Sequence, residues 1–161
     1  MPKLFIGPMS KNIVDATIDY ANSYGCELAF IPSRRQIDYN SGYVNGWTTE
    51  TFSQYVKSRS KNILLVRDHG GPMQGDTEDD GFASFAHDAL YFDVIHIDPW
   101  KYCVDFEDGI NLTAKYIDFC YKINNNIRFE IGTEQAIYKF DSWMLLKLLS
   151  SLKEKLNYNK F

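Results

Sequence analysis

The stretch NILLVRDHGGP, residues 62–72, joins a continuous apolar run to a polar turn. The run from Ile63 to Val66 has the length and composition of a strand that is covered on both faces, as in a parallel sheet. An adjacent Asp68-His69 pair and a Gly-Gly-Pro turn follow it directly. The stretch therefore predicts a buried parallel strand with polar chemistry at its carboxyl end.

Four similar segments occur along the chain, separated by stretches of helical periodicity. Strands are predicted at residues 3–7, 27–32, 62–67, 92–98 and 128–132. Helices are predicted from a cap at Ser10 to Gly25, from Thr48 or Thr49 through Val56, from Phe82 to Leu90, from a cap at Asp105 through Cys120, and from Ser142 to Leu156. The apolar positions of the first helix are Ile13, Ala16, Ile18 and Ala21. This alternation predicts parallel strands with right-handed crossovers.

An open doubly wound sheet and a (β/α)8 barrel both fit this alternation. The phosphate-binding motifs GxGxxG and GxxxxGK[ST] of open sheets are absent from the sequence. Charged or hydrogen-bonding residues instead end four of the strands, as at a barrel rim. We therefore predict an α/β fold of the (β/α)-barrel (TIM-barrel) type, in a single domain over residues 1–161. An eight-unit barrel takes about 250 residues, so the predicted barrel is incomplete, with about five βα units.

Composition restricts the classes of partner. The chain has 17 basic and 21 acidic residues and a formal charge of −4, with no basic patch that would favour nucleic acid. It has no apolar run of about 18 residues that could span a membrane, and its amino terminus does not resemble a signal peptide. Its 3 cysteines form neither a disulfide framework nor a CxxC metal motif. We expect a reducing cytoplasm, and neither nucleic acid nor membrane as a partner.

The candidate site residues lie at the strand ends. Asp68 and His69 offer an acid/base carboxylate and an imidazole metal ligand. His96 and Asp98 are two residues apart on the next strand, so both side chains face the same side of the sheet. We predict His69 and His96 as metal ligands and Asp68 as a catalytic residue. A structural His96–Asp98 pair is the alternative reading.

The second strand leads into a long polar loop whose first residues are candidates for substrate binding. Adjacent arginines can hold a phosphate or carboxylate bidentately. The predicted substrate contacts are Ser33, Arg34, Arg35, Gln36, Asp98 and Lys101. A solvated surface loop is the alternative for Arg34 and Arg35. Glu134 follows the fifth strand and is predicted as a second catalytic residue, either a base or a ligand.

At these strand ends the chain resembles the accessory (Z-type) subunit of class II tagatose-bisphosphate aldolase. The family's segment S-x-Q-V-x-x-x-G-G-Y-T-G-M-T corresponds to residues 33–48, G-D-H-L-G-P to 67–72, I-H-L-D to 95–98 and I-G-T-E to 131–134. The four motifs occur in the same order, and the resemblance covers residues 5–134. Arg67 stands at the family's glycine, and Gly70 at its leucine.

The resemblance implies a barrel related to the class II ketose-bisphosphate aldolases. In the catalytic relatives, the aspartate of the Asp-His pair is the acid/base at the cleaved bond and the histidine binds zinc. Those roles would fall to Asp68 and His69. The Z-type subunit itself is regarded as non-catalytic. Three hypotheses follow: an aldolase-like lyase that binds a phosphorylated sugar, a non-catalytic subunit that supports an aldolase partner or forms a homo-oligomer, and another lyase or isomerase acting on a sugar acid.

Overall fold

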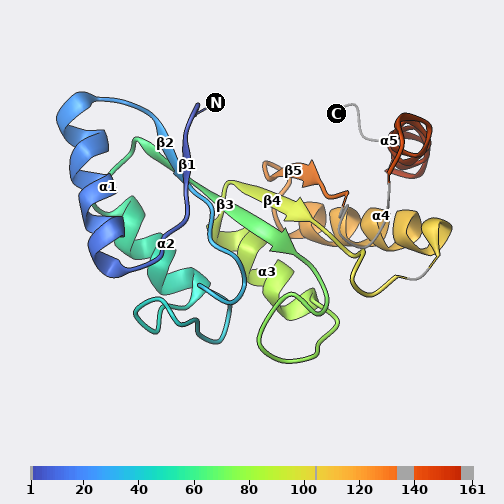
Figure 1. Cartoon of the computed structure of the whole chain (residues 1–161), viewed down its shortest axis with the longest axis horizontal. Helices are drawn as coiled ribbons and strands as arrows, with labels where there is room; N and C mark the ends of the chain where they lie inside the picture. Colours follow the sequence, from blue (N-terminus) through green and yellow to red (C-terminus); the bar gives the residue numbers. More distant parts are fainter. Residues whose placement is uncertain (1, 104, 134–139, 157–161) are drawn as a thin grey trace.

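A computed structural model describes residues 2–103, 105–133 and 140–156, which form a parallel sheet with helical crossovers (Figure 1). The sheet has five strands in the order β1-β2-β3-β4-β5, and every neighbouring pair is parallel. The order of the strands in space is their order along the chain, as in a barrel wall. The predicted α/β fold of the partial (β/α)-barrel type is therefore confirmed.

The predicted elements occur in the predicted order. The strands are β1 Phe5–Ile6, β2 Leu28–Phe30, β3 Ile63–Gly70, β4 Val94–Ile97 and β5 Arg128–Ile131. The helices are α1 Lys11–Tyr24, α2 Thr49–Lys57, α3 Phe82–Tyr91, α4 Phe106–Ile123 and α5 Ser142–Leu156. No helix in the described ranges is long and apolar enough to cross a membrane.

Local chemistry explains the helix ends. The Ser10 hydroxyl accepts the Ile13 N–H at the start of α1, and Gly25 ends the helix with a left-handed φ of 61°. The expected inner face of α1 was partly wrong, because Ile13 and Ala16 are exposed. The buried residues are Val14, Thr17, Ile18 and Ala21. Positions 14, 18 and 21 follow the i, i+4, i+7 spacing of one helix face, whereas 13 and 16 lie beside it.

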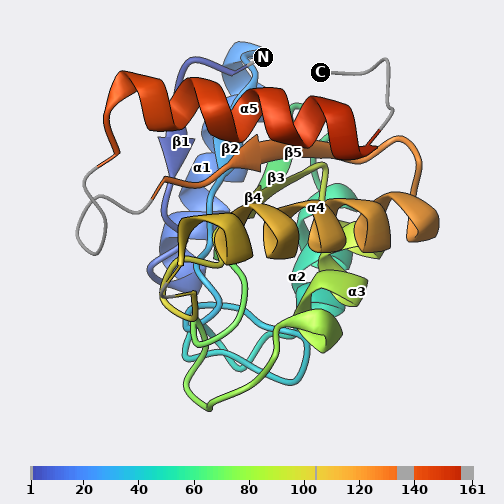
Figure 2. The ribbon, with the colours of Figure 1, turned by 90° about the vertical axis from the view of Figure 1, so that its right-hand side faces the viewer.

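Two apolar clusters join the sheet to its helices. One cluster unites α1, β2, α2 and β3 around Phe30 and Phe52, and the other unites α3, β4, α4 and α5 around Trp100 and Ile117. Figure 2 shows α5 running beside α4, with β5 between them in that view. On the other face of the sheet, Ala29, Val66 and Val94 form a smaller cluster. The sheet is thus a covered wall with a separate inner face.

Strand β3 extends three residues beyond its predicted end at Arg67. It continues to Gly70, and its register with β4 shifts between Arg67 and Gly70. The Arg67 side chain points into the helix layer, where it forms a bidentate pair with Asp88 of α3. Because side chains alternate along a strand, Asp68 points to the opposite, inner face. The carboxyl end of β3 therefore supplies both a structural ion pair and the first residues of the candidate site.

Candidate metal and substrate site

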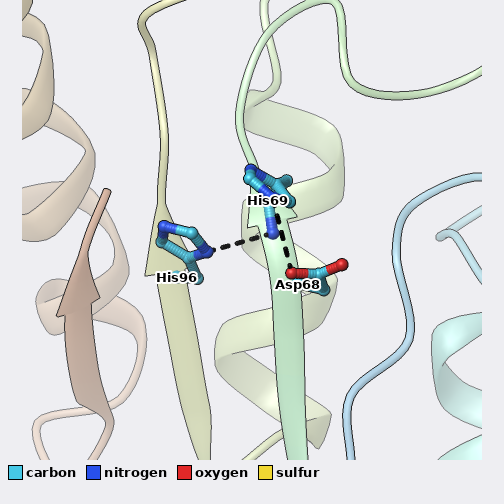
Figure 3. Close-up of side chains that lie close together, drawn as sticks. All are labelled: Asp68, His69 and His96. Carbon is cyan, nitrogen blue, oxygen red and sulfur yellow. Dashed lines mark hydrogen bonds and ion pairs between the residues drawn. The ribbon is translucent and has the colours of Figure 1, made fainter. Parts of the chain in front are cut away.

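Three predicted residues meet at the carboxyl ends of β3 and β4 (Figure 3). Asp68 and His69 come from β3 and His96 comes from β4. One ligand atom from each of the three lies within 4.8 Å of the others. At this spacing the two imidazoles can hold a zinc ion, with the carboxylate either as a third ligand or beside the metal.

His69 is the centre of the group. Its Nδ1 lies 2.6 Å from Asp98 Oδ2, and its Nε2 lies 3.7 Å from Asp68 Oδ1. The side chains of Asp68 and His69 are 35% and 42% exposed, whereas that of Asp98 is fully buried. The two ring nitrogens of His69 therefore face different surroundings: Nδ1 faces a buried carboxylate, and Nε2 faces the accessible cluster.

An unusual backbone turn places His69. Its φ is 43°, Met73 has a φ of 61°, and Gly71 has a φ of 152°. A Cβ at Gly71 would lie 2.4 Å from the Asp98 carbonyl oxygen, so only glycine fits this approach. Left-handed backbone at a residue other than glycine costs roughly 1–3 kcal/mol and persists where the surroundings hold it. The ring contact with Asp98 is one such constraint.

His96 is held more loosely than His69. Its Nδ1 accepts the backbone N–H of His69 at 3.3 Å, and the two rings lie 4.9 Å apart. Burial lowers the pKa of His96, although the nearby Glu130 carboxylate acts in the opposite direction. Burial therefore favours the neutral imidazole of His96, which is the form that binds a metal.

Glu130 is a neighbour that sequence reasoning missed. It is the register partner of His96 across β4 and β5, so both side chains leave the same face of the sheet. Counting the alternation along the fifth strand would have placed it there. The prediction chose Glu134 instead, and Glu134 lies outside the described residues.

Ser33 and Gln36 border the cluster on the β2 side. Ser33 forms an isolated parallel bridge with Asp68, which places it at the neighbouring strand end. Gln36 is buried, and its Oε1 accepts the backbone N–H of Ser33 at 2.8 Å. Ser33 therefore lies at the strand end next to Asp68, and Gln36 bonds the backbone of the loop that Ser33 begins.

The two adjacent arginines have different surroundings. Arg34, with a side chain only 1% exposed, is paired with Asp38 and Asp79 and donates to the Gly71 carbonyl at 2.6 Å. An arginine that is already paired with two carboxylates has no net positive charge to offer a phosphate, so this position does not fit the predicted substrate contact. Arg35 is exposed, and its Nε lies 3.7 Å from Asp76. Arg34 ties the β2–α2 and β3–α3 loops together, whereas Arg35 faces solvent.

The predicted substrate contact of Asp98 also changes. Its buried carboxylate is bonded by His69, by the Gln74 side chain and by the Trp100 backbone N–H. Because it is buried and already bonded to these groups, Asp98 does not fit the predicted substrate contact. Lys101 is exposed, and its Nζ donates to Gln74 Oε1 at 2.6 Å.

Solved structures of other proteins share this fold. A probable tagatose 6 phosphate kinase from Sinorhizobium meliloti 1021 matches with a TM-score of 0.72 at 16% identity, over 98% of this chain and 44% of that one. The YdjI aldolase from Escherichia coli K12 matches with a TM-score of 0.61 at 16% identity, over 92% and 49%. The chain shares its fold with these proteins.

A putative fructose-1,6-biphosphate aldolase from Coccidioides immitis also matches, with a TM-score of 0.54 at 17% identity, over 81% of this chain and 45% of that one. The chain thus spans less than half the length of each of these structures. No protein-family model and no curated protein sequence matches it. At this level of identity, the comparison establishes the shared α/β barrel fold.

The donor atoms can be tested for their fit to zinc. His69 presents Nε2 to the cluster while Nδ1 is bonded to a carboxylate, which is the usual arrangement of a metal-bound histidine. Asp68 offers a half-exposed carboxylate. His96 fits after one change. To bind a metal through Nδ1 it has to give up the 3.3 Å bond from the His69 N–H, and to bind through Nε2 it has to move its proton off that atom. The residues therefore fit zinc, with His69 as the best prepared ligand.

Proposed function

We propose that this chain is part of a class II aldolase-type protein of carbohydrate metabolism, which binds zinc and a phosphorylated ketose at the rim of its barrel wall. The observation that carries the proposal is the meeting of Asp68, His69 and His96 at adjacent strand ends, with ligand atoms within 4.8 Å. Barrel enzymes build their active sites at this rim. The four ordered motifs of the aldolase-related family support the same reading.

The proposed chemistry divides the residues by role. Zinc held by His69 and His96 would supply a Lewis acid that polarises the sugar carbonyl. Asp68 would take the proton of the hydroxyl next to the cleaved carbon–carbon bond. Cleavage would leave the bond's electron pair on the ketone fragment and release an aldehyde, and Asp68 would then return its proton to the carbon of that fragment. Ser33, Arg35 and Lys101 would bind the phosphorylated sugar, and Glu134 remains a proposed second catalytic group.

Zinc binding is the first test. Purified protein would be stripped of metal and titrated with zinc by calorimetry. We expect His69→Ala to weaken zinc binding by more than about 100-fold, because loss of a ligand exceeds the 10–100-fold cost of losing an outer partner. His87→Ala is the matched control, because His87 lies on α3 and its Nδ1 contacts only the carbonyl of its own helix at Ala83 among the bonds described. Equal affinities for the two variants would exclude the site.

Cleavage of ketose bisphosphates is the second test. We expect dihydroxyacetone phosphate to be released, and we expect the release to stop when zinc is chelated and to return when zinc is added. Asp68→Asn should abolish this release while weakening zinc binding much less than His69→Ala does. Cleavage that persists after all divalent metal is removed would refute the mechanism. Turnover of sugar acids, but not of ketose bisphosphates, would favour the alternative lyase or isomerase reaction.

A non-catalytic role beside an aldolase partner, or in a homo-oligomer, is the second proposal. The observation that favours it is the open sheet, because β1 and β5 each have one strand neighbour among the described residues. On α5, Leu145, Leu146 and Leu149 are exposed apolar residues. Exposed strand edges and apolar helix faces are usually covered by a partner. This role would be contradicted if the protein sediments as a monomer and recovers no partner in a pull-down.

A further inference from the structure

A line of polar side chains leads from the surface to His69. Lys101 Nζ donates to Gln74 Oε1 at 2.6 Å, and Gln74 Nε2 donates to Asp98 Oδ2 at 3.2 Å. The same Asp98 oxygen lies 2.6 Å from His69 Nδ1. The line crosses two loops, because Gln74 lies between β3 and α3 and Lys101 between β4 and α4. Gln74 and Asp98 are buried, so the bond between them is not readily exchanged for one with water.

The chemistry of the end groups fixes the direction of every bond in the line. An ammonium group has donors and no acceptor. Lys101 must therefore meet the oxygen of the Gln74 amide, which turns the amide N–H₂ toward Asp98. The opposite amide orientation would set two donors against each other at Lys101 and two acceptors against each other at Asp98. Only one orientation of Gln74 thus satisfies both neighbours.

The direction carries through to His69. A carboxylate has acceptors and no donor, so Asp98 Oδ2 meets His69 as an acceptor, and Nδ1 is the ring nitrogen that carries the proton. The lone pair of neutral His69 is then on Nε2, the atom that faces Asp68 at 3.7 Å. A ligand histidine needs this tautomer to bind a metal through Nε2.

We propose that Gln74 is a positioning residue that, with Lys101 and Asp98, holds His69 in the tautomer and orientation that present Nε2 to the metal. The purpose of this arrangement rests on the proposed zinc site, whereas the tautomer is a property of the metal-free protein. The role also accounts for a buried glutamine amide on a turn with left-handed backbone at Met73. A buried amide without partners would cost the protein stability.

Two variants distinguish the hydrogen bonds of the Gln74 side chain from its packing. Gln74→Met keeps an unbranched side chain and removes both bonds. Gln74→Glu keeps the size and the bond from Lys101, but it places an acceptor against Asp98. Gln54→Met is the matched control, because Gln54 is exposed on α2 and bonds Glu50 of the same helix. Thermal melts followed by circular dichroism would show that each variant is folded.

The first readout is the ring nitrogen spectrum of the metal-free protein in mildly alkaline buffer, where imidazole is neutral. With 3 histidines in the chain, substitution of each one assigns the signals. We expect His69 in the Nδ1–H form, with a downfield proton signal in the unaltered protein and in Gln54→Met that is weakened or lost in both Gln74 variants. An Nε2–H form in the unaltered protein, or an unchanged signal in both Gln74 variants, would overturn the inference.

The second readout is zinc affinity by calorimetry. We expect both Gln74 variants to bind zinc about tenfold more weakly, the lower end of the range for outer partners of metal ligands, and Gln54→Met to be unchanged. If the unaltered protein binds no zinc, the proposed function fails, and the ring signal alone decides the role of Gln74. If zinc binds equally well to every variant and the ring signal is unchanged, the zinc site stands and the role of Gln74 is refuted.

Discussion

The buried Arg67–Asp88 pair gives the sharpest stability prediction. Both side chains are 0% exposed, and Arg67 donates to Asp88 from Nε at 2.8 Å and from Nη2 at 2.7 Å. We expect Asp88→Asn, which preserves the shape of the side chain, to leave the guanidinium buried without its counter-charge. Removing one partner of a buried pair costs about 3–5 kcal/mol. Against a typical total of about 5–15 kcal/mol, that loss is a large share of the stability.

The double variant Arg67→Met/Asp88→Asn tests what else the arginine does. An isolated buried pair can often be replaced by apolar residues at little cost. Arg67, however, also donates to the carbonyls of Pro32 and Ile37, at 3.0 and 2.8 Å. The Pro32 carbonyl also accepts the Asp68 N–H, whereas the Ile37 carbonyl would lose its only donor among the described residues, at a cost of about 1–3 kcal/mol. We therefore expect the double variant to stay clearly less stable than the unaltered protein.

Urea denaturation followed by circular dichroism would measure both changes as shifts of the midpoint at constant slope. Lys122→Met is the control, because its partner Asp118 is a neighbour on the exposed face of α4. Exposed pairs one helical turn apart contribute about 0.3–0.5 kcal/mol. A double variant within about 1 kcal/mol of the unaltered protein would refute the view that Arg67 ties the β2–α2 loop to the sheet.

Two further predictions concern helix α4 and the Arg34–Asp79 pair between two loops. Gly109→Ala would place a Cβ 2.0 Å from the buried Trp100 ring, so we expect overpacking to reduce the stability by about 1–3 kcal/mol. The control Asn111→Ala, on the exposed side of α4, should instead gain about a few tenths of a kcal/mol from helix propensity. A Gly109→Ala variant that is more stable in urea denaturation than the unaltered protein would contradict the tight fit. Arg34 lowers the pKa of Asp79, so the stability from this pair is full above the unfolded pKa and is lost as pH falls through the folded one. Asp79→Asn should therefore cost up to about 1 kcal/mol at neutral pH and almost nothing in acid, and an equal loss at both pH values would show that the charge is not involved.

Much of the fold could be predicted because its signals are local. A Ser10 cap, a Gly25 stop and a Thr48 cap are each recognised by the backbone within a few residues. Continuous apolar runs located the strands, although β3 continued past its predicted end. The meeting of Asp68 with His96 also followed from local signals, because carboxyl ends of neighbouring parallel strands share one edge of the sheet.

The roles of individual polar residues could not be predicted in the same way. Arg34 and Arg35 are adjacent and chemically identical, yet one is buried between carboxylates and the other is exposed. Besides the nearby Asp38, Arg34 pairs with Asp79, which is 45 residues away along the chain. Gln74 gave no signal at all, because a glutamine beside a turn is ordinarily a surface residue. Its partners come from a different loop.

The sequence by itself determined the parallel alternation of strands and helices, the caps, and the gathering of acid and histidine residues at one rim. The tertiary structure alone decided which nitrogen of His69 faces Asp98 and which faces Asp68. Periodicity reports only which face of an element a side chain leaves. Hydrogen bonds depend on distances and angles that are set by the left-handed turn at His69 and by two loops packed against each other.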